Sequence, residues 1–159
     1  MLQVQHIHPM LVHFPIVLIL LLAVFDLVAT LRGVSVTGRT TVGTISTLLV
    51  VTIAVFAALT FHFGDVALSF AEDRGFSSEI AEIHEGLGEW VAMASIVYAL
   101  LRMGLWWRDL RVENGLRMVF PLAAIAASGL VLMTAYYGGQ LVYDLGVNVA
   151  SLATTAATN

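Results

Sequence analysis

The chain has 159 residues, of which 59% are hydrophobic and only 11% are charged, with a formal net charge of -4. The mean hydropathy is +0.92. In soluble domains about a quarter of the residues are charged, so this composition excludes an ordinary soluble domain and indicates a multi-pass membrane protein. The length allows several spans within one domain, residues 1–159, but no separate soluble domain of useful size.

Cysteine and lysine are both absent from the sequence. The absence of cysteine excludes thiolate ligation, covalent c-type haem attachment and a nucleophilic thiol. The absence of lysine leaves no basic patch, so we do not expect nucleic acid as a partner. The first five residues carry no positive charge, and the apolar run after them is too long for a cleavable signal peptide. We therefore expect the first span to stay in the mature protein.

Four long apolar stretches predict an all-α protein, an integral membrane four-helix bundle. A hydrocarbon core about 30 Å thick needs about 20 residues at 1.5 Å of rise each. The second stretch is rich in β-branched residues, but a backbone in lipid must satisfy its own hydrogen bonds, which favours a helix. The predicted spans are residues 8–31, 42–63, 85–107 and 118–137, followed by an outward-facing tail, 138–159.

Local signals mark several helix ends. Arg32 and Gly33 are expected to end the first span, and the segment 61–65 to end the second. Ser77 or Ser78, followed by Glu79 and two further acids, is typical of a helix N-terminus. The third helix is therefore expected to start outside the bilayer, after an acidic connection over residues 65–85.

Arginine positions predict the orientation in the membrane. All arginines except Arg74 follow the first or the third span or lie at its end. By the positive-inside rule these turns are cytoplasmic, and both termini and the acidic connection are extracytoplasmic. The five histidines, which come from three different helices, then gather near the outer face: His6, His8, His13, His62 and His84.

A histidine that enters the membrane is a functional-site hypothesis by default. His13 is expected about a turn below the outer surface, where it either binds a cofactor or hydrogen-bonds a backbone carbonyl. His84 begins a stripe of small residues that includes Gly88 and Ala92. Such a stripe allows another helix to approach closely, and it also leaves room for a flat macrocycle whose iron the histidine would hold.

The remaining histidines also have more than one interpretation each. His62 is either a second axial ligand, or a partner that orients one, or an interfacial residue between two phenylalanines. His6 and His8 are interfacial residues, or they join Met10 and His13 in a set of imidazole and thioether ligands that suits copper.

Acidic residues give two further predictions. Glu82, Glu85 and Glu89 share one helix face, which is either a solvated surface or a docking surface for a basic partner. Asp26 lies inside the first span, where a carboxylate needs a partner. We expect that partner to be one of three arginines, Arg32, Arg39 or Arg102.

The sequence resembles a bacterial four-helix family known only as a predicted membrane protein of unknown function. The resemblance rests on HPMLVHFP (residues 8–15), on the pairs Phe25-Asp26 and Gly64-Asp65, on His84, and on GGQLVY (residues 138–143). It implies a multi-pass protein of the bacterial cytoplasmic membrane that works with redox systems and is suspected of binding haem. Where the family usually carries a tail histidine this chain has Leu145, so a site that used that histidine is lost.

Together these observations predict a b-type haem subunit that carries electrons near the extracytoplasmic face of a larger redox complex. His13 and His84 are the first choice of axial ligands, His62 and then His8 are the substitutes, and Gly88 lies beside the cofactor. The expected partners are membrane and extracytoplasmic redox subunits, quinol and the lipid bilayer. The alternatives are a non-catalytic structural subunit and a copper-binding membrane protein; an enzyme acting by itself is the less favoured interpretation.

Overall fold

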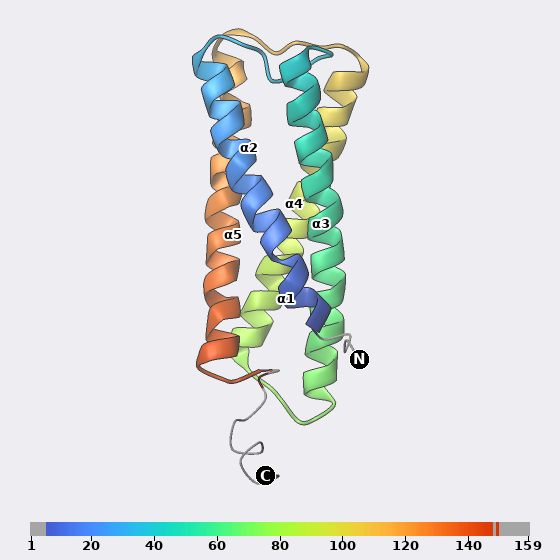
Figure 1. Cartoon of the computed structure of the whole chain (residues 1–159), viewed down its shortest axis with the longest axis vertical. Coiled ribbons are helices and arrows are strands. Elements are labelled where there is room, and N and C mark those ends of the chain that lie inside the picture. Colours follow the sequence, from blue (N-terminus) through green and yellow to red (C-terminus); the bar gives the residue numbers. More distant parts are fainter. Residues whose placement is uncertain (1–5, 148, 150–159) are drawn as a thin grey trace, which may run out of the picture.

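The structure is a computed structural model that describes residues 6–147 and 149, and all the regular structure within them is helical (Figure 1). The elements are α1 (Ile7–Leu11), α2 (His13–Leu31), α3 (Thr41–Glu72), α4 (Glu79–Trp107), the 3-10 helix η2 (Asn114–Met118) and α5 (Val119–Tyr143). Four stretches, Ile7–Leu31, Thr41–Glu72, Glu79–Trp107 and Asn114–Tyr143, are long and apolar enough to cross a membrane. The predicted four-helix membrane fold is confirmed.

The first span ends as the sequence predicts. Arg32 caps α2, and Gly33 follows with a positive φ of 77°, a conformation that glycine adopts without strain. Near the start of the span, α1 and α2 are separated at Val12. Pro15, three residues later, has no N–H with which to continue the helical hydrogen bonds, which accounts for a break at this point.

Two helices are longer than the predicted spans. α3 continues through segment 61–65 to Glu72, and α5 continues through Gly138 and Gly139 to Tyr143. Both helices thus extend beyond residues 63 and 137, where the predicted membrane spans end, and the connection between α3 and α4 shrinks to residues 73–78. Polar residues end a membrane crossing, but they do not end a helix that still buries one face. Residues 150–159 of the predicted tail lie outside the described part.

α4 begins at the predicted position. Ser78 is its N-cap, and the Ser78 hydroxyl accepts a hydrogen bond from the backbone N–H of Ile80 over 3.2 Å. Glu79 and Glu82 lie in the first turn, where the positive end of the helix dipole favours carboxylates. The hydrophilic start of the third span is thus confirmed.

The four long helices lie in a ring, in which α2 and α4 each pack against both α3 and α5. Two connections, α2 to α3 and α4 to α5, lie at one end of the bundle (Figure 1). We call this the arginine end, because Arg32, Arg39, Arg108, Arg111 and Arg117 lie in or beside those connections. The opposite end holds α1, the turn between α3 and α4 and the end of α5, and we call it the histidine end.

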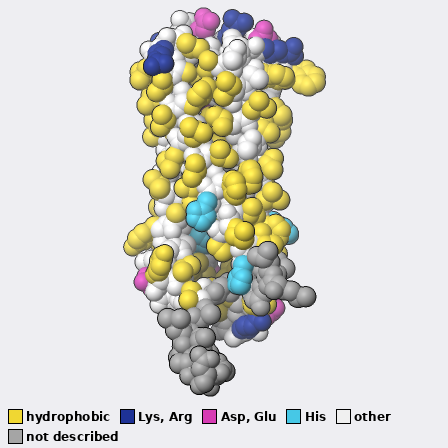
Figure 2. All heavy atoms as spheres, in the orientation of Figure 1, with side chains coloured by type: hydrophobic (Ala, Val, Ile, Leu, Met, Phe, Trp, Pro, Cys, Tyr) yellow, Lys and Arg dark blue, Asp and Glu magenta, His cyan; other side chains and the backbone are white. Residues whose placement is uncertain are grey.

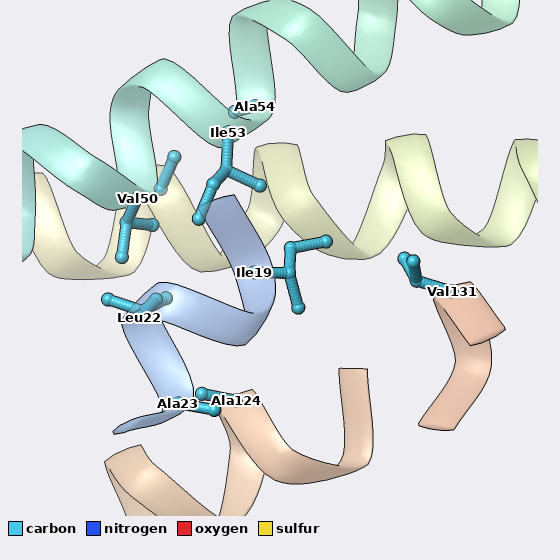
Figure 3. Close-up of a cluster of buried hydrophobic side chains, with 9 residues drawn as sticks. Ile19, Leu22, Ala23, Val50, Ile53, Ala54, Ala124 and Val131 are labelled. Carbon is cyan, nitrogen blue, oxygen red and sulfur yellow. The ribbon is translucent and has the colours of Figure 1, made fainter. Parts of the chain in front are cut away.

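Hydrophobic side chains cover the middle of the bundle, and charged side chains gather at the two ends (Figure 2). Inside, small and branched side chains fill the centre between α2, α3 and α5 (Figure 3). The buried cluster consists of Ile19, Leu22, Ala23, Val50, Ile53, Ala54, Ala99, Ala124 and Val131. An apolar surface around a close-packed interior is what a bundle in lipid requires.

Candidate functional site

The structure brings two of the five histidines together at the histidine end. The ring centroids of His8, in α1, and His84, in α4, are 6.1 Å apart, and the ring planes are nearly perpendicular at 89°. Both residues are half-buried. The first and the third span therefore each contribute one imidazole to a shared site.

Each of these imidazoles is held by a backbone carbonyl of a neighbouring helix. Nδ1 of His8 lies 2.9 Å from the carbonyl oxygen of Thr60 in α3, and Nδ1 of His84 lies 2.9 Å from the carbonyl oxygen of Thr134 in α5. A carbonyl oxygen only accepts hydrogen bonds, so this geometry assigns the proton to Nδ1 in both rings. Nε2 of each ring is then an unprotonated lone-pair donor. Histidines that bind metals are commonly oriented by the same kind of bond.

A glycine lies beside each ring. A Cβ added to Gly64 would come within 2.9 Å of Nδ1 of His8, and one added to Gly138 would come within 2.8 Å of Cε1 of His84. Both distances are shorter than real Cβ contacts allow. Both rings therefore occupy space that any other residue at these two positions would fill.

His13, the deeper of the two predicted axial ligands, lies elsewhere. Its side chain is exposed on the surface of the bundle, whereas His84 is paired with His8. His62 is also exposed, with its ring 5.3 Å from that of Phe63. His8, the last of the predicted substitutes, is thus the histidine that the structure places next to His84.

The predicted set of copper ligands is not assembled in the described residues. His6, Met10 and His13 are all exposed, and His8 is turned to Thr60 instead. Within the described part of the chain, no three His, Cys, Asp or Glu side chains come together as a metal-binding group. The site is a pair of imidazoles, not a cluster.

The small-residue stripe that begins after His84 is covered by a helix. Ala92 and Ala99 are buried, and Gly88 faces the ring of Phe61 in α3. Of the two interpretations of the stripe, close helix packing is the one that the structure favours. Gly88, which is predicted to lie beside the cofactor, therefore packs against α3.

Carboxylates of α3 and α4 surround the histidine end. The charge of Glu85 in α4 interacts with those of Asp65 and Glu72 in α3, and with those of Glu82 and Glu89 in its own helix. These five residues form what we call the acidic rim. The rim gives this end of the molecule a negative potential, whereas the arginine end is positive.

A second polar cluster is buried near the arginine end. Nη1 of Arg102 donates to Oδ2 of Asp26 over 3.0 Å, and both side chains have no exposed surface. Arg102 also donates to the Ser46 hydroxyl and to the carbonyl of Val36, and Ser46 in turn donates to Asp26. Of the three arginines expected as partners for Asp26, Arg102 is the one that binds it.

Sequence reasoning missed the residues that hold the histidine pair. Thr60 and Thr134 act through backbone carbonyls, which side-chain chemistry does not reveal, and the sequence places Gly64 at the end of the second span and Gly138 at the start of the tail. One signal was available: the pattern T-x-x-x-G occurs at residues 60–64 and again at residues 134–138. A repeated pattern of this kind predicts a repeated structural role.

Comparison with known proteins identifies the family. The sequence model of a family described as "Predicted membrane protein (DUF2231)" matches residues 5–151, which is nearly the whole chain. The chain belongs to this family of predicted membrane proteins. Neither the curated proteins nor the solved structures contain a significant match to it.

Proposed function

We propose that this member of the family binds haem b at its histidine end, with His8 and His84 as the axial ligands. The observation that carries the proposal is the 6.1 Å separation of the two ring centroids. This separation brings together two imidazoles from two different helices, and haem iron in helix bundles is held by two such ligands from facing helices. The proposal replaces His13 with His8 in the predicted pair, because His13 is exposed and the ring of His8 lies next to that of His84.

The number of available ligands favours haem over a bare metal ion. Zinc sites use three or four protein ligands, and the described residues offer no group of three. Haem brings its own equatorial nitrogens and needs only two axial ligands, which bundles supply from facing helices. A pair of histidines from two helices is thus a complete set for haem and an incomplete one for zinc.

The surrounding residues provide what axial ligands need. The carbonyls of Thr60 and Thr134 keep the proton on Nδ1, so that Nε2 of each ring is free to bind. Hydrogen bonding to a carbonyl also raises the basicity of a ligating imidazole. When bound, haem supplies one-electron redox chemistry, and the chain's contribution is to hold and orient its ligands.

The charge distribution supports an extracytoplasmic site in a bacterial cytoplasmic membrane. By the positive-inside rule the arginine end is cytoplasmic, which leaves the histidine pair and both ends of the described chain outside. All five histidines of the sequence lie in residues 6–84, and none falls in a connection at the arginine end. This chain therefore exchanges electrons at one face, with quinol or with another redox subunit, as a non-catalytic component of a larger complex.

A structural role is the second candidate, and one specific observation favours it. Both imidazoles already make a hydrogen bond through Nδ1 and fill the space beside a glycine. In this interpretation the histidines only tie the first span to α3 and α4 to α5, and the subunit is an accessory protein.

A visible spectrum of the purified protein separates the two functions. The full chain is expressed with ample haem, purified in detergent and analysed by a reduced-minus-oxidised spectrum and a pyridine haemochrome assay. We expect a b-type spectrum in the wild type that is lost in His8→Ala and His84→Ala.

His13→Ala and His62→Ala are the matched controls, because both histidines are exposed, and we expect them to keep the haem. Loss of haem in His13→Ala but not in His8→Ala would restore the pair predicted from the sequence. A wild type without haem would overturn the proposal and leave the structural role.

A further inference from the structure

The two halves of the bundle repeat each other at a fixed spacing. In the first span of each half, a histidine precedes a fully buried charged residue by 18 positions: His8 precedes Asp26, and His84 precedes Arg102. Residues 76 positions apart thus correspond to each other. Each of the two corresponding pairs is also in contact, the imidazoles at one end and the ion pair toward the other.

The second helices repeat in the same way. Thr60 and Gly64 in α3 correspond to Thr134 and Gly138 in α5, 74 positions later. The exposure of side chains repeats at the same spacing of 74 positions. Residues 46–50 and residues 120–124 have buried and exposed side chains in the same order. The bundle is therefore two similar helical hairpins related by an approximate two-fold axis that runs along its length.

Within each hairpin the histidine, the threonine carbonyl and the glycine form one unit. Nδ1 of His8 donates a hydrogen bond to the carbonyl of Thr60, and the same ring fills the space that a Cβ at Gly64 would occupy. Side chains on a helix lean toward its N-terminus, so the Cβ of a residue partly covers the carbonyl one turn earlier. A glycine one turn after the threonine uncovers that carbonyl for an imidazole.

We propose that Gly64 and Gly138 are positioning residues for the histidine pair. Each opens a notch through which one imidazole reaches a helix carbonyl, and the notch thereby fixes the proton on Nδ1 and leaves Nε2 free. The recurrence of the notch in both hairpins makes the two imidazoles equivalent. The purpose of the notch rests on the proposed function, whereas the fixing of the imidazole tautomer does not require haem.

The first test uses the haem-free full chain with ¹⁵N-labelled histidine in detergent micelles. Nitrogen chemical shifts distinguish the two imidazole tautomers, and His8→Gln and His84→Gln assign the signals. We expect the wild type to hold both rings with the proton on Nδ1. Gly138→Ala should shift the nitrogen signals of His84 alone toward those of the exposed histidines. Gly64→Ala should do the same to the signals of His8 alone.

Gly139→Ala is the matched control, because a Cβ at this neighbouring glycine meets nothing within 4 Å. It should leave all the histidine signals unchanged. The inference is overturned if Gly138→Ala leaves the His84 tautomer as it is in the wild type, or if Gly139→Ala changes it as much as Gly138→Ala does.

A second test remains informative if Gly138→Ala folds poorly. Thermal unfolding is measured for Gly138→Ala in the wild-type chain and in a His84→Ala chain, from which the opposing ring has been removed. We expect a lower midpoint temperature in the first chain and an unchanged or higher one in the second, because alanine is the better helix former. A similar loss in both chains would overturn the inference.

The haem-loaded protein separates this inference from the proposed function. If haem binds, Gly64→Ala and Gly138→Ala should change the low-spin electron paramagnetic resonance spectrum or the midpoint potential, whereas Gly139→Ala should not. If the wild type takes up no haem but the tautomer shifts occur, the proposed function fails and the positioning role stands. If haem binds and neither glycine changes the tautomer or the spectrum, the positioning role fails alone.

Discussion

Replacing Asp26 with alanine is expected to destabilise the protein by about 3–5 kcal/mol, because it leaves a buried cation without its counterion. The carboxylate accepts from Arg102 over 3.0 Å, and neither side chain has any exposed surface. The Ser46 hydroxyl loses its acceptor in the same change. The remaining partners of the guanidinium, such as the carbonyl of Val36, are neutral and do not compensate its charge.

Unfolding by titration with a denaturing detergent, followed by tryptophan fluorescence, measures this loss. Trp106 is a suitable probe because its indole N–H donates to the Thr44 hydroxyl near the same end. The double variant Asp26→Ala with Arg102→Met removes both charges, and it should be more stable than Asp26→Ala alone. A single variant within about 1 kcal/mol of the wild type, or a double variant less stable than the single one, would refute the reasoning.

Two further predictions concern α4 and use thermal unfolding in detergent. Ser78→Ala removes the N-cap hydroxyl and should cost about 1 kcal/mol, whereas Ser77→Ala, which leaves the cap intact, should not. Ala92→Leu should cost about 1–3 kcal/mol by overpacking the stripe that α3 covers, while Ala94→Leu on the exposed face should be nearly neutral. Equal effects in either pair of variants would contradict the assigned contacts.

The sequence was sufficient for the features that depend on a single helix. Run lengths of apolar residues identified the four spans, and Ser78 and Gly33 marked helix ends through their own local chemistry. The partner of Asp26 was limited to three arginines, because a buried carboxylate needs a nearby cation and the sequence has few. These inferences needed no knowledge of how the helices are rotated about their axes.

The choice between His8 and His13 did depend on that rotation. Depth along the first span favours His13, but depth does not determine which side of a helix faces the bundle. In addition, α1 ends before Val12, so that His8 and His13 belong to different helices. Likewise, glycine is a residue typical of helix ends, and only the packed neighbours of Gly64 and Gly138 show that these glycines make room for the imidazole rings of His8 and His84.

The approximate two-fold axis explains why one corresponding pair consists of opposite charges, Asp26 and Arg102, whereas the other consists of two histidines, His8 and His84. Corresponding residues face each other near such an axis, so a repeated charged residue would bury two like charges together. At the inner pair this conflict is resolved by opposite residues, Asp26 against Arg102. At the histidine end the two residues are identical, and neutral imidazoles with Nδ1 bound to carbonyls can lie close together without repulsion.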